Sequence, residues 1–206
     1  MISINSSGNT LQLSTLQEIT SSKKCTLRIT YTDKLQQIVS TNEAKINTLT
    51  DLDLESVSFQ AKDQSKLFLN SKSKAISITL FNNAKAEINC KGQKTALKLT
   101  NEASVKALIA SNDVSLEMDQ KSEAKVEGDC TNLQLVLDNA TQCNGKNLTA
   151  LNADISLSAS ANALVLVKSN LDLSLSGKAE LDLYGEPKIQ IKKLTDSVIL
   201  RKKPLK

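Results

Sequence analysis

The chain of 206 residues contains no His and no Trp, and only 2 Pro, 6 Gly and 2% aromatic residues. Without His, neither a Ser-His-Asp triad nor a Cys-His nucleophile can form, and the imidazole ligands of most catalytic zinc sites are missing. The scarcity of aromatic rings removes stacking platforms for bases, so we expect no nucleic-acid partner. With so little Pro and Gly, no flexible linker divides the chain.

Acid–base chemistry would fall to carboxylates. The candidates are the alternating Asp51, Asp53 and Glu55, and a later group formed by Asp172, Glu180 and Asp182. Equivalent positions elsewhere carry Ser, Lys and Asn, which favours an ordinary solvated face over a glycosidase pair. We therefore predict that the protein is not an enzyme, and we assign no catalytic residue, no cofactor-binding residue, no cofactor and no metal ligand.

A repeat of small residues dominates the sequence. The members of this column are Ala44, Ser65, Ala84, Ala103, Ala124, Ala140, Ala161 and Ala179. They span 135 residues in seven periods, with spacings of 16 to 21. Alternating apolar runs such as Ile76, Ile78 and Leu80 flank them, and a period of two is typical of strands. A fixed period near 19 residues indicates a solenoid. The predicted fold is all-β, a single-domain parallel β-helix (β-solenoid) of 19–20 residues per coil.

A second column lies two residues before each small residue. Its members are Asn42, Asp63, Asn82, Asn101, Ser122, Asp138, Ala159 and Gly177. Asn, Asp and Gly tolerate a left-handed backbone or cap a bend with their own side chain. We predict structural turns at Asn42, Asp63, Asn82, Asn101, Asp138 and Gly177. A hairpin signal of the Asn-Gly type is noted only at Asn144-Gly145, which argues against an antiparallel sandwich.

The predicted organisation is one β-helix domain over residues 1–206. Residues 1–40 form first coils and an N-terminal cap, with strands in CTLRITY and KLQQIVS; residues 41–187 form regular coils. Residues 188–206 form a C-terminal strand and a basic tail with a charge of +6, against +4 for the whole chain. We interpret these lysines as a solvated end that discourages edge-to-edge strand pairing, in preference to an anchor for an anionic surface.

The four cysteines invite a disulfide interpretation. Cys90 and Cys130 each follow a small anchor residue by six positions, and Ile109 holds the equivalent place between them. We expect them in one inward column, two coils apart and too distant to form a disulfide. A bridge between Cys130 and Cys143 stays open, and Cys25 has no assigned partner.

The C-terminal sequence LSLSGKAELDLYGEPKIQIKKLTDSVI resembles the last coil of the putative auto-transporter adhesin head GIN domain family. The matching elements are a Ser176-Gly177 turn, an alternating strand, the motif Tyr184-Gly185-Glu186-Pro187 and a basic strand. The earlier YTDKLQQIVSTNEAKI is similar to that family's opening strand. Tyr184, Gly185 and Pro187 are predicted to shape the terminal bend, since Pro restricts the backbone and Gly allows a sharp reversal.

The resemblance implies a secreted or cell-surface β-helix with no established enzymatic activity. We expect an adhesive or structural module that binds an unidentified surface or glycan through its polar strand faces, with Lys85, Glu87, Lys98 and Lys106 as contact surface. The expected location is extracellular, outer-membrane-associated or periplasmic. The opening MISINSSGNT lacks the features of a signal peptide, and we expect no transmembrane segment because no apolar run is long enough.

Two alternatives stay open at this point. One is a polysaccharide-acting β-helix enzyme that uses Asp/Glu pairs in a groove. The other is a self-assembling scaffold that polymerises end to end, as bactofilin-like β-helices do; it would require apolar, uncapped ends. The oligomeric state is undetermined by the sequence.

Overall fold

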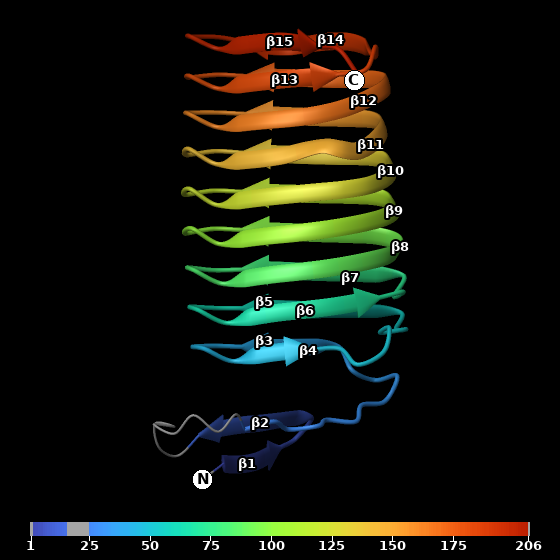
Figure 1. Cartoon of the computed structure of the whole chain (residues 1–206), viewed down its shortest axis with the longest axis vertical. Helices are drawn as coiled ribbons and strands as arrows, with labels where there is room; N and C mark the ends of the chain where they lie inside the picture. The colour runs from blue at the N-terminus through green and yellow to red at the C-terminus, as the bar shows by residue number, and fades with distance from the viewer. Residues whose placement is uncertain (1, 16–24, 206) are drawn as a thin grey trace. The chain divides into compact units, whose positions relative to one another are not determined.

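The computed structural model describes residues 2–15 and 25–205, and the chain divides into two compact units, residues 1–31 and 32–206. Every regular element in these described ranges is a β-strand (Figure 1). The strands are β1 (Ile2–Ser7), β2 (Thr10–Thr15), β3 (Gln37–Ser40), β4 (Lys45–Asn47), β5 (Ser56–Ala61), β6 (Lys66–Ser71), β7 (Ala75–Leu80), β8 (Lys85–Leu99), β9 (Ser104–Met118), β10 (Glu123–Leu137), β11 (Gln142–Leu157), β12 (Asn162–Leu175), β13 (Glu180–Tyr184), β14 (Lys188–Leu194) and β15 (Ile199–Lys203).

The second unit confirms the predicted parallel β-solenoid. It contains about nine turns of roughly 19 residues, and each strand between the end coils pairs in parallel with the strand one coil earlier and one coil later. Each coil consists of a strand on a first wall, a corner, a strand on a second wall and a tight turn (Figure 1). The first wall holds β4, β6, the first halves of β8 to β12, β13 and β15. The second holds β3, β5, β7, the second halves of β8 to β12, and β14.

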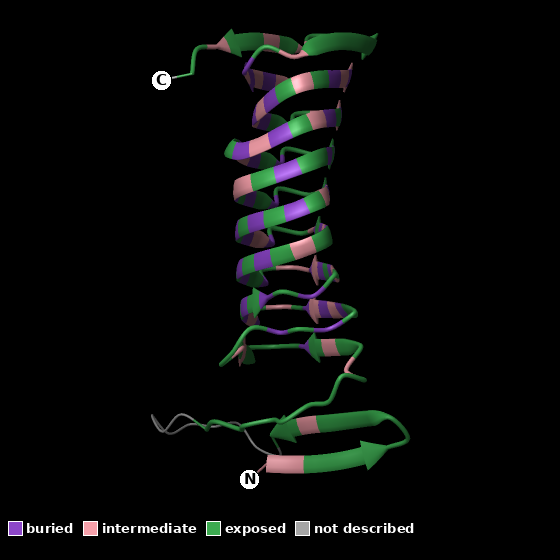
Figure 2. Ribbon diagram, turned by 90° about the vertical axis from the view of Figure 1, so that its right-hand side faces the viewer, coloured by how far each residue is buried: buried purple, intermediate pink, exposed green. Residues whose placement is uncertain are grey.

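Alternation along the strands places one set of side chains inside the solenoid (Figure 2). One inward column of the second wall runs from Ile38 through Phe59, Ile78, Leu97, Leu116, Leu135, Ile155 and Leu173 to Ile191. Burial of such aliphatic side chains stabilises each by about 1.5–3 kcal/mol relative to exposure. The interior is closely packed: a void of about 10 Å³ lies among core residues that include Leu97, Leu116 and Leu135.

The column of small residues is real, but two of its predicted members are shifted. The structure aligns Ser65, Ala84, Ala103, Ser122, Thr141, Ala161 and Ala179, and all seven are fully buried. Ser122 and Thr141 thus take the places that we predicted for Ala124 and Ala140. Ala124 is buried two positions further along, whereas Ala140 and also Ala44 are exposed. A tight turn accepts any side chain small enough to fit beneath it, so an Ala-based alignment went out of phase where Ser and Thr replace Ala.

The first unit differs from the coils expected over residues 1–40. β1 and β2 pair antiparallel, joined by Gly8 and Asn9, and Gly8 has a φ of 56°. Gly-Asn between two alternating runs is a hairpin signal, and it was not used in the prediction. The Asn144-Gly145 pair, noted above as a hairpin signal, forms no hairpin and lies inside β11. Residues 25–31, the expected strand CTLRITY, form no strand, and regular coiling begins with β3.

The cysteines occupy different columns from those predicted. Cys90 pairs in register with Ile109, whose next neighbour is Gly128, whereas Cys130 pairs with Ser111 and Ala150. The shift follows from placing the anchor of that coil at Ala124 instead of Ser122. All four thiols are free; Cys25 is exposed and the other three are buried.

Burial has a direct effect on the buried thiols. Desolvation raises the pKa of Cys143 from 9.0 to about 12, because the interior disfavours the thiolate. In the unfolded chain the thiol ionises at its ordinary pKa. The folded state therefore has its full stability with respect to this thiol below pH 9. It loses that stability as the pH rises toward 12, because the unfolded chain releases the proton first.

We predict that the free energy of unfolding falls as the pH is raised from 9 to 11, and that Cys143→Ala reduces this slope by about 1.4 kcal/mol per pH unit. Urea titrations followed by circular dichroism at several pH values measure the free energy of unfolding and therefore its slope with pH. Cys25→Ala is the matched control and should leave the slope unchanged. An equal slope in the wild type and Cys143→Ala would show that the thiol ionises freely in the folded state.

Gly128 lies near the corner of β10 and has an unusual backbone conformation, with a φ of 114°. A Cβ on this residue would overlap the carbonyl oxygen of Ile109 in the coil before it. Both the conformation and the overlap exclude a side chain here. We predict that Gly128→Ala lowers the free energy of unfolding of the solenoid by about 2–4 kcal/mol.

Denaturant unfolding measures this loss, with Gly8→Ala as the control. Gly8 also has positive φ, but a Cβ there meets no atom within 4 Å and it lies in the other compact unit. A solenoid transition unaltered by Gly128→Ala would contradict the close stacking described for this corner.

Candidate functional site

The tight turns stack on one edge of the solenoid, and their backbone conformation is unusual. Asn42, Asp63, Asn82 and Asn101 have φ values of 55° to 62°, and Gly177 has 74°. These are left-handed conformations that Asn, Asp and Gly adopt at low cost. At the remaining predicted turn residue, Asp138, φ is not positive. Its carboxylate instead accepts a hydrogen bond from the amide of Asn139, whose φ is 51°.

Three consecutive turns contain two left-handed residues each. The pairs are Asn101-Glu102, Gln120-Lys121 and Asn139-Ala140. In these turns the backbone itself joins the stack: the Glu102 amide donates to the Gln120 carbonyl at 2.9 Å, and the Lys121 amide donates to the Asn139 carbonyl at 3.0 Å. Glu, Lys and Ala adopt this conformation at a cost of about 1–2 kcal/mol each, which the surrounding stack must offset.

Side chains also connect successive turns. Asn82 Nδ2 donates to Asp63 Oδ1 at 2.9 Å, and Asn139 Nδ2 donates to Asp119 Oδ1 at 2.8 Å. Ser158 Oγ donates to Asp138 Oδ1 at 2.8 Å. The turns therefore form a hydrogen-bonded ladder with one rung per coil.

An open trough of about 700 Å³ runs along this ladder. Its lining is formed by Asn82, Asn83, Asn101, Glu102, Gln120, Lys121, Asn139, Ala140, Ala159 and Ser160. Eight of these ten residues have positive φ; Asn83 and Ser160 are the other two. Five carboxamides supply both donors and acceptors, and Glu102 and Lys121 add one charge of each sign. Strained residues gathered around a polar hollow are typical of functional sites, so we take this trough as the candidate site.

The predicted contact residues do not gather there. Lys85, Glu87 and Lys106 lie exposed on the first wall, whereas Lys98 lies on the second. Lys106 and Glu87 form an ion pair at 3.9 Å, and Lys98 pairs with Glu117 at 2.8 Å. The hydrogen bond and the charge of Glu117 raise the pKa of Lys98. The four side chains therefore lie on two different walls, and among these described residues the Lys106–Glu87 ion pair is the one polar contact between any two of them.

The residues of the predicted terminal bend lie at the corner between β13 and β14. Tyr184 ends β13, Gly185 is buried with a φ of 87°, and Pro187 directly precedes β14. A Cβ on Gly185 would overlap the carbonyl oxygen of Val167. This corner lies at the opposite edge from the tight turns and contributes nothing to the trough.

Five of the six candidate carboxylates, all except Asp53, form ion pairs with basic side chains. Asp51 pairs with Lys72 at 2.8 Å and Glu55 with Lys74 at 2.7 Å. Asp172, together with Asp154, contacts Lys192; Glu180 and Asp182 contact Arg201. Glu180 and Asp182 are partly buried and share Arg201 as their partner, so the two candidate carboxylates that the structure brings together are neutralised by one guanidinium. Within residues 2–15 and 25–205, no cluster of three or more His, Cys, Asp or Glu side chains suits a metal ion.

Of the residues that line the trough, only Asn82 and Asn101 were predicted as structural turns. Glu102, Gln120 and Lys121 are not typical left-handed residues, so residue type alone gives no signal. A constant period would have helped: counting onward from Asn82 in steps of 19 residues reaches Asn101, Gln120 and Asn139.

A comparison with known protein families finds one family model that matches most of the chain. The model for the putative auto-transporter adhesin, head GIN domain, matches residues 1–187. The chain belongs to this family. The family match stops at the corner before β14, so the last coil of the solenoid lies beyond it. No curated protein sequence matches this chain.

A solved structure shares the fold of this head GIN domain. It is a putative lipid binding protein from Parabacteroides distasonis ATCC 8503, with a TM-score of 0.63 and 15% sequence identity. The match covers 70% of this chain and 58% of that one, so the head GIN chain aligns with less than two thirds of that protein's length. Among the described residues, no helix is long and apolar enough to cross a membrane.

The left-handed conformation of the turns that line the trough can be tested by a substitution at Ala140. Ala140 is exposed and has a φ of 60°, a conformation in which its Cβ is unfavourable and glycine is not. We predict that Ala140→Gly raises the free energy of unfolding by about 0.5–1 kcal/mol.

Thermal and urea unfolding measure this gain. Ala110→Gly, an exposed site within β9 with ordinary φ, is the matched control and should lose about 0.5–1 kcal/mol. A loss of stability at both positions would mean that Ala140 is not held in the left-handed region.

Proposed function

We propose that this head GIN solenoid is a non-catalytic adhesive module that acts outside the cytoplasm, at the cell surface or in the periplasm. The family to which it belongs is described as an adhesin head, which supports an extracytoplasmic binding role. The observation that carries the proposal is the trough of amide side chains held on rigid, left-handed turns. In this view the trough, more than the strand faces with Lys85, Glu87, Lys98 and Lys106, is the contact surface.

The chemistry of the trough suits a polyhydroxylated polymer. Asn and Gln amides can donate and accept at once, which matches the paired donor and acceptor character of sugar hydroxyls. The turns repeat at the strand spacing of about 4.8 Å, so an extended glycan lying along the trough would meet similar groups at each coil. Because few aromatic rings exist in the chain, binding would rest on many weak polar contacts, as expected of a multivalent adhesin.

A catalytic role receives no comparable support. Five of the six candidate carboxylates form ion pairs with Lys or Arg, and a general acid for glycoside hydrolysis requires a raised pKa. Another carboxylate of the first wall, Glu127, has its pKa shifted in the opposite direction: the hydrogen bond and the charge of Lys125 lower it.

Lipid binding in the interior is also disfavoured. The structurally similar protein is named for lipid binding, but the void among the core residues here measures about 10 Å³, which is about the room of one water molecule. An acyl chain would therefore have to lie on an outer face of this solenoid.

A panel of immobilised glycans, probed with the labelled full chain, tests the proposal. We expect binding without release of reducing sugar, and we expect Ser160→Trp to weaken it at least tenfold because the indole fills part of the trough. Ser160 is exposed and has ordinary φ, so the substitution should not disturb the turn.

Ser77→Trp, exposed on the second wall, is the matched control and should bind as the wild type does. Equal losses in the two variants would move the contact surface to the walls. Binding to anionic or neutral lipid vesicles with none to glycans, or product release from any glycan, would overturn the proposal.

A further inference from the structure

The last coil leaves the core columns of the solenoid uncovered. Ile189, Ile191 and Leu194 of β14 are 44%, 51% and 48% exposed, although the residues in register one coil below are fully buried. Within the described residues, β14 pairs only with β12 and β15 only with β13. The solenoid therefore ends in an apolar surface bordered by unpaired backbone, which is a template for a further strand.

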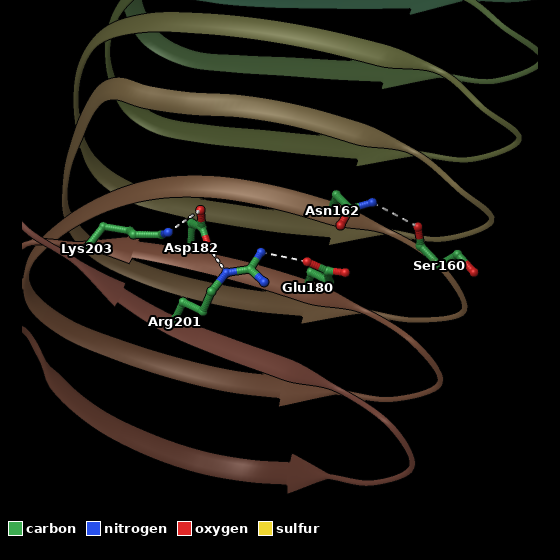
Figure 3. Close-up of polar contacts among 6 residues, drawn as sticks. All are labelled: Ser160, Asn162, Glu180, Asp182, Arg201 and Lys203. Carbon is green, nitrogen blue, oxygen red and sulfur yellow. Dashed lines mark hydrogen bonds and ion pairs between the residues drawn. The ribbon is translucent and has the colours of Figure 1, made fainter.

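Four basic side chains at this end form ion pairs with acidic residues and so are not free to block strand pairing at the edge. Figure 3 shows Arg201 between Asp182 and Glu180: its Nε and Nη2 donate to their carboxylates, both at 2.6 Å, and Lys203 lies 3.6 Å from Asp182. Lys192 contacts Asp172 at 2.8 Å and Lys202 contacts Glu186 at 3.1 Å. Lysine on an edge strand blocks pairing when it must be desolvated. Here four of the basic groups are already paired with acids outside the last coil.

The first coil presents the same columns at the other end of the solenoid. Ile38 of β3 begins the inward column that ends in Ile191, and Ile46 of β4 begins the one that ends in Leu200. Ile38 and Ile46 are half-buried against the core. Among outward columns, Val39 begins the one that Lys193 ends. A copy stacked on the last coil would thus continue both inward columns with aliphatic side chains, Ile38 after Ile191 and Ile46 after Leu200.

Formal charge favours joining unlike ends. Residues 188–203 sum to +5, because six Lys and Arg oppose Asp196, whereas residues 32–55 sum to −3, because five Asp and Glu oppose two Lys. Four of these basic groups are paired with acids outside the last coil, so the charge that two facing last coils would oppose comes mainly from Lys188 and Lys193 of each copy, and this like charge still disfavours a tail-to-tail dimer. Opposite charges on unlike ends select the head-to-tail arrangement.

We propose that the last coil, with its exposed face of Ile189, Ile191 and Leu194, is the docking surface for a second copy of this chain, which adds its first coil as the next rung. β14 then pairs with β3 of the next copy, and β15 with its β4. Such contacts are heterologous and translate along the solenoid, so they do not close into a ring and the product is an open-ended filament. This assembly is independent of the trough at the turn edge and does not rely on the proposed function.

Directed disulfide formation tests the register. Val39 and Lys193 are exposed and share one outward column, so Val39→Cys in one copy and Lys193→Cys in another come within about 4.8 Å between Cα atoms, a distance that a disulfide spans. Both variants are made in the full chain carrying Cys25→Ser, which removes the exposed native thiol. A mixture of the two single variants should form a heterodimer under mild oxidation, and the double variant should form a ladder of covalent oligomers on a non-reducing gel.

Leu108→Cys, on the first wall and 51% exposed, is the matched control and should cross-link at least tenfold more slowly. High salt should slow the reaction of the mixture, since it screens the unlike charges. Preferential cross-linking of Lys193→Cys with itself would establish a tail-to-tail contact and overturn the proposal. So would cross-linking no faster than the control, or a monomer by light scattering at all concentrations.

Discussion

The structure depends on the need to close each coil within about 19 residues while keeping every strand in register with its neighbours. Parallel pairing gives each backbone group a partner in the coil above or below. This pairing is kept only if every tight turn places the next strand one inter-strand spacing along the solenoid and in register. A left-handed residue at each turn provides that reversal, from Asn42 in the first turn to Asp196 in the last. The filled aliphatic core and the side-chain ladders follow from this repeated geometry.

The side-chain ladders show how register is reinforced. On the second wall, Asn132, Asn152 and Asn170 each donate an amide hydrogen bond to the residue one coil earlier, and the chain of bonds begins at Asp113. Stacked amides of this kind stabilise parallel in-register strands generally. They lie beside the corner, opposite the turn ladder, so both edges of the solenoid are tied together.

The alternation of apolar and polar residues was sufficient to predict the strands, the solenoid and the parallel pairing, because a period of two and a period of 19 leave few other folds. The phase of the repeat was harder to obtain. Ser122 and Thr141 occupy positions that Ala fills in other coils, so an alignment on Ala slipped and carried Cys130 into the wrong column. The hairpin of residues 2–15 has no counterpart in the repeat, and Gly8-Asn9 was its one local signal. The trough could not be predicted from residue type, since Glu102, Gln120 and Lys121 take a left-handed conformation only because the stack imposes it.

The molecule thus separates its surfaces by role. The walls carry exposed ion pairs such as Lys98–Glu117, which neutralise one another. The turn edge carries amides on a rigid backbone, and the last coil carries apolar residues that no further coil covers. Under the two proposals, an adhesive edge on a solenoid that lengthens by stacking would multiply weak contacts, and this is the regime in which avidity exceeds single-site affinity.

Amide hydrogen exchange at the turns is the most direct measurement of the central claim that the turns are hydrogen-bonded rungs of the stack. The amides of Glu102 and Lys121 donate to carbonyls of the next turn, although both residues are exposed. The account predicts that their exchange, followed residue by residue by NMR, is slowed to an extent comparable with strand amides in β9. Exchange of both amides at the rate of an unstructured peptide would contradict it.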